Sequence, residues 1–555
     1  MKGVKIPFTQ KPRQVLKPVT TTTSESEKIL DTEVQNLLQK GAIFQTTLSD
    51  EGFYSRLFLI PKKDGTMRPV FDLSLLNTFI ENKHFQMENL SSIKTLLNPG
   101  DWMTKLDLRD AYLTVAIDPQ SQKFLRFIWK DKIYQFQALP FGLNIAPLVF
   151  TQLLKPVSAY LRKRGVRLIL YLDDMLIIGS SVQETKRFTQ MARNLLMSLG
   201  FTVHTGKSIS VPTKVINFLG FTIDSNTMLI SLPAEKTKKT VTLCRHMLTT
   251  KQVSLRTLAQ LLGVLESHRA AVWRAPLHFR QLQSQLISGL LSSNHCYDTI
   301  IHLTRASKLE LSWWVQNIQK VNGSPIVPPA PDLVIFTDAS KVGWGAVCDK
   351  VKKNGKWTAQ DRALHINVLE LKGAFLAVQA LLKNQSHKTV NLNMDNSTAV
   401  AYINHKGGTH SMELTQLTLA LWDWCIHRNI YLIAHYVPGK TNILADLESR
   451  VFLDQTDWKL DHQVIQPFLS QCRTDLFATR LTRQLKQYIS WRPDPEACDT
   501  DALSVNWQGL KGYAFPPFNL IPAVLKKVVT DQTEIVLIAP VWQAQPWWPL
   551  LLSLL

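Results

Sequence analysis

Three aspartates stand at the ends of strand-like runs, where carboxylates can hold metal ions for phosphoryl transfer. Asp107 closes the run WMTKLD, and Asp173 and Asp174 separate two apolar runs in RLILYLDDMLIIG. Two-metal phosphoryl transfer needs carboxylates that hold Mg²⁺ ions about 4 Å apart, beside the attacking hydroxyl and the leaving pyrophosphate. Burying adjacent carboxylates at a hairpin tip is costly unless a cation is present. The alternative interpretation is that Asp173-Asp174 forms an ordinary turn.

A second set of acidic residues follows a proline-rich boundary. The segment Asn322–Asp332, NGSPIVPPAPD, contains four prolines, and proline interrupts both helices and strand ladders. Beyond it the pattern predicts a strand LVIFTDAS, a glycine turn, a strand WGAVCD, a helix HINVLELKGAFLAVQALL, and strands VNLNMD and IYLIAHYV. Asp338, Glu370, Asp395 and Asp446 lie on these elements in chain order. Taken singly, Glu370 could be a helix-surface residue, and Asp395 or Asp446 a helix cap.

The composition indicates a globular protein that binds a polyanion. The 555 residues include 63 Lys and Arg against 43 Asp and Glu, so the formal net charge is +20. A strongly basic chain favours a nucleic-acid partner. Residues 453–555 contain nine basic and ten acidic residues, so the positive excess lies upstream. With 45% hydrophobic residues, the chain can bury full cores, and its length suggests roughly three or four domains.

The six cysteines are far apart and contain no CxxC pair, which indicates neither a zinc ribbon nor a disulfide framework and fits a reducing compartment. The basic N-terminus lacks the apolar run of a signal peptide, and no apolar stretch reaches the roughly 18 residues of a membrane span. We therefore expect an intracellular protein of the nucleus or cytoplasm, with no membrane partner.

Local patterns predict further elements along the chain. Ser24 and Glu27 form a capping-box pattern before apolar residues at helical spacing. Leu57–Leu73 contains two extended runs around Asp64-Gly65, which predicts a hairpin. The region from Leu232 to about Val321 has a helical pattern with many Arg and His residues, and the run EIVLIAPVW near the C-terminus predicts a strand.

The motifs KLDLRDAY, LPFGLNIAP and YLDDMLIIG occur in this order, and together they resemble the palm of a reverse transcriptase. PKKDGTMRPVFDLSLLN resembles the fingers of such enzymes, and NFLGF their primer-gripping hairpin. The resemblance implies a right-hand polymerase that copies an RNA template from a DNA primer, using deoxynucleoside triphosphates with Mg²⁺ or Mn²⁺. It also implies that Asp107 and Asp173 hold the metal ions, with Asp174 supporting them.

The same resemblance assigns substrate contacts. Lys62 and Arg68 match the finger residues that clamp the incoming triphosphate, with a solvated hairpin face as the alternative. Tyr112 matches the aromatic residue that packs under the sugar and excludes a 2′-hydroxyl, although a core tyrosine would have the same pattern. Phe141 stands where retroviral enzymes carry Gln, so the contacts there must be apolar. Lys207 is a candidate proton donor to pyrophosphate, and an ordinary surface lysine is the alternative.

In their order, Asp338, Glu370, Asp395 and Asp446 resemble the D-E-D-D site of ribonuclease H. This resemblance implies two metal ions that cut the RNA strand of an RNA–DNA hybrid, with the 2′-hydroxyl distinguishing RNA from DNA. The loop VPGKTN before Asp446 lacks the His that related enzymes often carry. His435 lies in the preceding strand, where a structural role is expected.

Other motifs resemble DIRS-type, tyrosine-recombinase retrotransposons. HFQMENLSSI, LRKRGVRLILYLDD and APLHFRQLQ carry this resemblance, which implies an element-encoded recombinase and a nucleocapsid-like protein as partners. The tail resembles the degenerate adenine-methyltransferase-like region of those elements. In the tail of this chain, the tetrapeptide Phe515-Pro516-Pro517-Phe518 has Phe515 at the position where an active methyltransferase needs a hydrogen-bond acceptor. Asp475 could mark a cofactor-binding turn. A structural or protein-binding domain is the alternative, and the apolar end WWPLLLSLL suggests that the polypeptide continues.

The expected fold class is therefore multidomain α+β: a right-hand polymerase with fingers, palm and helical thumb/connection, a ribonuclease H-like α/β domain, and an α/β methyltransferase-like region. Two alternatives to this function are a domesticated or decayed element protein that binds nucleic acid without catalysis, and a methyltransferase with a polymerase attached. The expected boundaries are 1–25 for an N-terminal extension, 26–232 for fingers and palm, 233–321 for the thumb/connection, 322–331 for a linker, 332–452 for the ribonuclease H-like domain and 453–555 for the last region.

Overall fold

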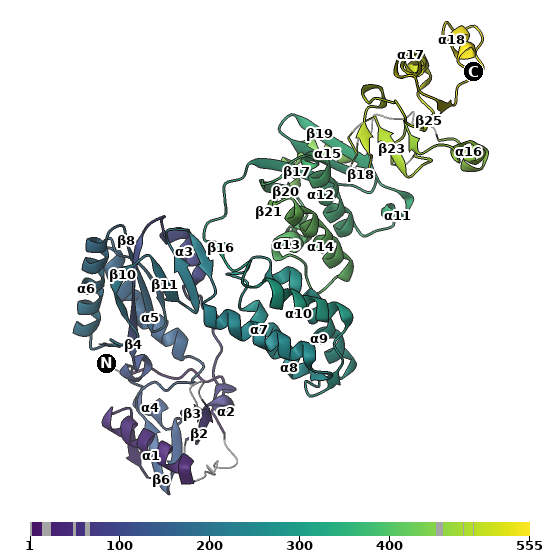
Figure 1. Cartoon of the computed structure of the whole chain (residues 1–555). Coiled ribbons are helices and arrows are strands. Elements are labelled where there is room, and N and C mark those ends of the chain that lie inside the picture. The colour runs from purple at the N-terminus through teal and green to yellow at the C-terminus, as the bar shows by residue number, and fades with distance from the viewer. Residues whose placement is uncertain are drawn as a thin grey trace. The chain divides into compact units, whose positions relative to one another are not determined.

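The computed structural model describes residues 3–13, 24–47, 52–61, 67–450, 459–480, 482–491, 493–494 and 496–555. The chain forms two compact units, each built from several stretches of sequence (Figure 1). In the described ranges, each helix is too short or too polar to cross a membrane. The first unit contains Met1–Lys239, Ala270–Trp273 and Gln319–Val327, and the second contains Thr240–Arg269, Arg274–Ile318 and Pro328–Leu555.

The N-terminal part of the first unit joins a helix to two small antiparallel sheets. The helix α1 begins at Ser24, as the capping-box pattern predicted, and buries Leu30 and Val34. Strands β2 and β3 pair in antiparallel register, which confirms the two arms of the predicted hairpin, while its turn at 62–66 lies outside the described residues. β1, β6 and β5 form the other sheet. The bounds are α1 Ser24–Gln39, β1 Ile43–Thr46, β2 Arg56–Pro61, β3 Met67–Asp72, α2 Ser74–Asn77, β5 Arg126–Trp129 and β6 Lys132–Phe136.

The centre of the first unit is an antiparallel sheet in the order β10-β4-β8-β7, with β9 also paired to β4. Helix α6 packs on β4 and β8, and α5 packs on β7. The apolar runs on both sides of Asp173-Asp174 become β7 and β8, as predicted. The bounds are α3 Leu90–Leu96, β4 Trp102–Arg109, η1 Ala111–Thr114, α4 Pro119–Gln122, α5 Ala146–Arg162, β7 Arg167–Tyr171, β8 Asp174–Gly179, α6 Val182–Ser198, β9 Thr202–Val203 and β10 Ile209–Thr213.

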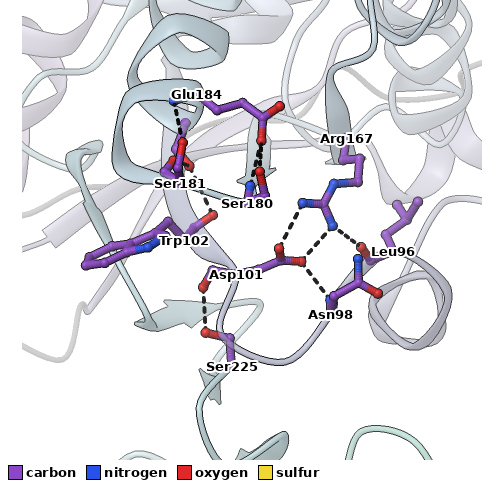
Figure 2. A network of polar contacts seen from close by, with 10 residues as sticks. Leu96, Asn98, Asp101, Trp102, Arg167, Ser180, Ser181, Glu184 and Ser225 are labelled. Atoms are coloured by element: carbon purple, nitrogen blue, oxygen red, sulfur yellow. Dashed lines mark hydrogen bonds and ion pairs between the residues drawn. The ribbon is translucent and has the colours of Figure 1, made fainter.

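An ion pair between a buried aspartate and a half-buried arginine holds the end of this sheet that is remote from Asp107. Figure 2 shows Arg167, the first residue of β7, directed at the Asp101 carboxylate beside β4, with distances of 2.6 and 2.9 Å. The same carboxylate accepts the backbone N–H of Asn98, and Arg167 also donates to the carbonyl of Leu96. The Ser225 hydroxyl donates to the carbonyl of Asp101. Helix α3, two strands and a later turn are therefore tied together at one point.

A further antiparallel sheet follows the central sheet along the chain, with the strands in the order β11-β12-β13-β16. The predicted NFLGF hairpin is β11 and β12, and Gly220 at φ 78° allows its tight turn. The first part of the expected linker differs from the prediction, because Ser324–Pro325 forms the edge strand β16 against β13. Proline is tolerated there because an edge strand needs fewer ladder hydrogen bonds. The bounds are β11 Val215–Phe218, β12 Phe221–Asp224, β13 Leu229–Ser231 and β16 Ser324–Pro325.

The region after β13 is helical, as its periodicity predicted. Helix α8 buries Leu255, Leu258, Leu261 and Leu265 on one face. Two short strands, β14 and β15, pair beside the helices. The bounds are α7 Ala234–Thr249, β14 Val253–Ser254, α8 Leu255–Glu266, η2 Ala275–His278, α9 Arg280–Ser292, β15 Ile300–Ile301 and α10 Arg305–Asn317.

The region after the prolines is a mixed α/β sheet in the order β19-β18-β17-β20-β21, with β17, β20 and β21 parallel. The predicted strands and the long helix α12 are all present. Gly343 and Gly345 do not form the expected turn but lie inside β18. The polar strand β19 was not predicted. The bounds are β17 Leu333–Ala339, β18 Gly343–Cys348, β19 Val351–Lys356, α11 Ala359–Arg362, α12 Ile366–Leu382, β20 Thr389–Met394, α13 Ser397–His405, α14 Met412–His427, β21 Tyr431–Tyr436, η3 Gly439–Thr441 and α15 Ile443–Arg450.

The C-terminal region contains a parallel sheet in the order β24-β23-β22-β25-β26. It is α/β, as expected, and EIVLIAPVW supplies β26. The methyltransferase likeness is not supported by the comparisons reported below and stays a prediction. The bounds are α16 His462–Leu469, β22 Thr474–Asp475, β23 Gln487–Ser490, β24 Asp499–Thr500, η4 Ala502–Ser504, β25 Gly512–Ala514, η5 Phe518–Leu520, α17 Ile521–Asp531, β26 Ile535–Leu537 and α18 Trp548–Ser553.

Candidate active sites

Strand pairing brings the first set of carboxylates together. In the register of β4 and β8, Asp107 lies directly opposite Asp174. Strands β7 and β8 are joined by the two residues Leu172 and Asp173, and Leu172 has a left-handed φ of 52°. The N–H of Leu108 donates to the Asp173 carbonyl at 2.9 Å, which holds the hairpin tip against β4. Left-handed non-glycine residues cost roughly 1–2 kcal/mol, and such strained positions cluster at functional sites.

The charges at this tip repel one another. Asp107 is buried, with 8% of its surface exposed. Burial raises the pKa of the Asp173 carboxyl above its usual value, and the neighbouring charges of Asp174 and Asp107 raise it further, while Lys207 lowers it. A divalent cation would remove this repulsion, and carboxylate oxygens are the ligands that Mg²⁺ prefers. The donor set therefore fits Mg²⁺ at this tip.

Two aromatic residues expected at the sugar of the nucleotide lie next to each other. The rings of Tyr112, in η1, and Phe141 are 5.0 Å apart in an edge arrangement, and Phe150 packs on Tyr112 at 5.3 Å. Burial, with the nearby Asp173 charge, raises the pKa of Tyr112 to about 12, so its hydroxyl stays neutral. Phe141 is 56% exposed. Together the rings form an apolar platform with an accessible edge.

The structure describes only some of the residues that are expected to contact the triphosphate. Lys62 lies outside the described residues, and Arg68 is in β3 opposite Ile60, with its side chain outside the description. Lys207 is exposed and close enough to Asp173 to lower the pKa of that carboxyl.

The loop that carries Lys207 is tied to Asp107 by contacts that our sequence reasoning missed. The N–H of His204 donates to the Asp107 carbonyl at 2.8 Å, and the Asp107 N–H donates to the Ser208 hydroxyl at 3.0 Å. Both residues lie in the segment 200–208, GFTVHTGKS, but nothing in their types indicates these contacts.

The second set of carboxylates gathers at one edge of the other sheet. Strands β17 and β20 are parallel, so Asp338 near the end of β17 and Asp395 just after β20 lie at the same edge. Glu370 on α12 completes a group in which the three ligand oxygens lie within 4.8 Å of one another. Asp338 and Glu370 are 4% and 5% exposed. Like charges this close repel unless a cation offsets them, so the group fits a divalent metal ion.

Asp446 lies on α15, which packs on β17 and β18, but it is not part of that three-residue group. One helical turn later, the buried Ser449 hydroxyl donates to Asp338 Oδ2 at 2.7 Å. Close packing of α15 depends on Gly345, because a Cβ there would lie 2.5 Å from the Ala445 carbonyl oxygen. The contribution of Ser449 was not predicted. His435 is exposed on β21.

The comparisons with known proteins cover the segment that carries the first site. Residues 60–223 match the family model described as "Reverse transcriptase (RNA-dependent DNA polymerase)". The putative enzymatic polyprotein of Cassava vein mosaic virus is 23% identical over 451 residues, covering 77% of this chain and 65% of the relative. The Transposon Tf2-7 polyprotein of Schizosaccharomyces pombe is 21% identical over 428 residues, covering 72% of this chain and 29% of the relative. The chain thus spans less than two thirds of the length of these relatives.

Solved structures with a similar fold include foamy viral protease-reverse transcriptases. The dRH form in complex with double-stranded DNA is 18% identical with a TM-score of 0.50, covering 78% of this chain and 74% of that chain. The complex with an RNA/DNA hybrid has the same identity and TM-score, covering 82% of this chain and 58% of that chain. Residues 60–223 therefore match a reverse transcriptase domain, and the longer chain is similar in sequence to viral and transposon polyproteins and in fold to foamy viral protease-reverse transcriptases.

Proposed function

We propose that this chain is an RNA-directed DNA polymerase that extends a DNA primer on an RNA template. The observation that carries the proposal is the register of β4 and β8, which sets Asp107 against the Asp173-Asp174 hairpin inside the reverse transcriptase domain. Bound Mg²⁺ would activate the primer hydroxyl and stabilise the leaving pyrophosphate. Asp107 and Asp173 would hold the metal ions, and β4 would fix their separation.

The side chains around the hairpin suit the remaining steps. Tyr112 and Phe141 would form the apolar floor under a deoxyribose, so that a ribose 2′-hydroxyl would meet the tyrosine ring. Lys62 and Arg68 would bind the triphosphate, and Lys207 would donate a proton to the leaving pyrophosphate. The structural neighbours bind double-stranded DNA and an RNA/DNA hybrid, which supports the same class of substrate here.

We further propose that the second carboxylate group hydrolyses the RNA strand of the hybrid. The support is the close approach of Asp338, Glu370 and Asp395 at one sheet edge, an arrangement suited to two-metal hydrolysis. Asp446, on the neighbouring helix α15, would become the fourth carboxylate of this group when metal and substrate bind. We therefore keep 26–232 as the polymerase core, 233–321 as the thumb/connection and 332–452 as the ribonuclease H-like domain.

The type of element is a finer proposal. The motifs quoted above favour a DIRS-type element with a recombinase and a nucleocapsid-like protein as partners, and a degenerate methyltransferase-like region at 453–555. Detection of a tyrosine recombinase reading frame beside the coding sequence would support this assignment. An aspartic protease and an integrase in the same polyprotein would contradict it.

Single-site variants test both activities when primer extension and cleavage of the RNA strand are measured side by side. Asp173→Asn is expected to lower deoxynucleotide incorporation on an RNA template by about 10²-fold or more, as loss of a preorganised charge does, and to leave RNA cleavage intact. Asp338→Asn is expected to do the reverse. Asp298→Asn, at an exposed carboxylate of the helical region, is the matched control. If the parent binds the hybrid but neither extends nor cleaves it, the non-catalytic alternative replaces this proposal.

A further inference from the structure

The loop that carries Phe141 is anchored at both ends and exposed in the middle. Leu139 and Leu143 are buried, with 0% and 2% of their surfaces exposed, whereas Phe141 is 56% exposed. Gly142 has a left-handed φ of 93°, and a Cβ at this position would lie 3.3 Å from the carbonyl oxygen of Phe71. Burial therefore fixes the two ends of the loop, while its exposed middle has few apolar contacts to hold it.

The side chain of Asn77 holds the middle of this loop through two hydrogen bonds to the backbone. Its Nδ2 atom donates to the Gly142 carbonyl at 2.9 Å, and its Oδ1 atom accepts the backbone N–H of Asn144, also at 2.9 Å. A carboxamide has one donor side and one acceptor side, so the two bonds together fix its orientation and that of the loop backbone. Asn77 is the last residue of PKKDGTMRPVFDLSLLN, and Phe141 belongs to LPFGLNIAP. The contact therefore joins two motifs that are distant in the sequence.

Asn77 reaches the loop from an element whose start is itself held in place. It is the last residue of the short helix α2. The Asp72 carboxylate accepts both the backbone N–H and the hydroxyl of Ser74 at the start of α2, and these hydrogen bonds lower the pKa of the Asp72 carboxyl. Arg56, on the paired strand, lies 3.5 Å from the same carboxylate. The anchor of Asn77 is therefore independent of the loop that it contacts.

We propose that Asn77 is a positioning residue that sets the selectivity for the sugar of the incoming nucleotide by holding the Phe141 loop. This role rests on the proposed polymerase function and deepens it, because Asn77 acts on the sugar only through another side chain. The Phe141 ring lies 5.0 Å from the Tyr112 ring, so a shift of the loop moves one half of the apolar platform relative to the other. Loss of Asn77 weakens nucleotide binding and sugar discrimination, while the carboxylates that hold metal stay in place.

A double-mutant cycle tests whether Asn77 acts through Phe141. The variants of the full chain are Asn77→Ala, Phe141→Ala and Asn77→Ala/Phe141→Ala, with Asn194→Ala as the matched control at an exposed asparagine of α6. Primer extension on an RNA template gives kcat and KM for deoxynucleotides and for ribonucleotides. Hydrogen exchange of the Asn144 amide, followed by mass spectrometry, reports the loop directly. Exchange of the β3 amides reports whether the surrounding fold is intact.

Asn77→Ala is expected to raise KM for deoxynucleotides about tenfold and to change kcat by less than about threefold, since it removes two hydrogen bonds that support binding and leaves the chemistry unchanged. Its preference for deoxynucleotides over ribonucleotides should fall about threefold or more. The Asn144 amide should exchange about tenfold faster while the β3 amides exchange as in the parent. The double variant should have the KM of Phe141→Ala, and Asn194→Ala should match the parent in every measurement.

Three outcomes would overturn the assignment. Additive effects of the two substitutions on KM would show that Asn77 does not act through Phe141. Faster exchange of the Asn144 amide with an unchanged KM and sugar preference would show that the loop is held without any effect on the nucleotide. Equally faster exchange of the β3 amides would show that Asn77 supports the whole region and not the loop. If the parent extends no primer, the polymerase proposal fails, and exchange of the Asn144 amide still decides separately whether Asn77 holds the loop.

Discussion

At the scale of single residues, the proposed polymerase function predicts that Tyr112 sets the preference for the sugar of the incoming nucleotide. Tyr112→Ala removes the ring that packs against Phe141 and Phe150, so it is expected to lower the preference for deoxynucleotides over ribonucleotides about tenfold or more. Single-nucleotide incorporation with each class of triphosphate measures the ratio. Tyr112→Phe keeps the ring and should keep the preference, and an unchanged ratio in Tyr112→Ala would show that the tyrosine is only a core residue.

Ser449 acts on the second site through Asp338. Its hydroxyl orients Asp338 Oδ2 at 2.7 Å, and loss of such a supporting contact typically costs 10- to 100-fold in metal affinity or activity. Ser449→Ala should therefore slow cleavage of labelled RNA in a hybrid about tenfold while primer extension stays unchanged. Ser386→Ala, at an exposed serine, is the control, and equal cleavage rates in both variants would argue against the role of Ser449.

At the scale of elements, the ion pair between the buried Asp101 and the half-buried Arg167 holds the sheet that carries Asp107 and Asp174. Asp101→Ala leaves the half-buried Arg167 guanidinium without its partner, which is expected to lower the free energy of unfolding by about 1–3 kcal/mol. Hydrogen exchange of β7 amides, followed by mass spectrometry, reports this loss. The control Asp298→Ala removes an exposed partner of Arg256, so its β7 amides should exchange as slowly as those of the parent. If the β7 amides exchange equally fast in Asp101→Ala and Asp298→Ala, the prediction is wrong.

Glu310 gives the helical region a predictable pH dependence. Its buried carboxylate accepts the N–H groups of Gln281 and Leu282 at the start of α9, and burial raises its pKa from 4.5 to about 7. The folded state binds the Glu310 proton more tightly than the unfolded state does. Proton binding at Glu310 therefore stabilises the fold fully below pH 4.5, and this stabilisation is lost as the pH rises through about 7.

Glu310→Gln is therefore expected to remove that pH dependence. The loss in the parent amounts to at most about 3 kcal/mol, seen as a falling thermal midpoint between about pH 4.5 and 7. The thermal midpoint of the variant should fall less than that of the parent over the same range. Glu266→Gln, at an exposed partner of Arg269, should follow the parent, and parallel curves for parent and Glu310→Gln would rule the explanation out.

At the scale of the whole molecule, the net charge of +20 predicts binding that depends on salt and little on sequence. If binding neutralises six to ten phosphates, affinity for a hybrid should fall about 10³- to 10⁵-fold between about 50 and 200 mM salt. Fluorescence anisotropy over a salt series, with two hybrids of unrelated sequence, measures this slope. A salt-independent affinity, or a large difference between the two sequences, would contradict the electrostatic account.

Local patterns were sufficient to predict the main elements that carry the two sets of acidic residues. The capping box at Ser24, the apolar runs around Asp173-Asp174 and the helical periodicity of α8 and α12 all depend on neighbouring residues, which is why they are visible in the sequence. The polar strand β19 was missed because an edge strand needs no apolar alternation. Gly345 was expected in a turn, yet it lies in β18, where a glycine is needed because α15 packs too closely for a Cβ.

The sequence by itself determined the residue types, their order and the elements that carry them, including both sets of acidic residues and the reverse transcriptase motifs. Only the tertiary structure decided which contacts form: Asn77 with the backbone of Gly142 and Asn144, Ser449 with Asp338, and Glu370 with the aspartates at the strand ends. The physical reason is that side-chain contacts between distant segments depend on strand register and helix packing. Those are set by the whole core and not by neighbouring residues.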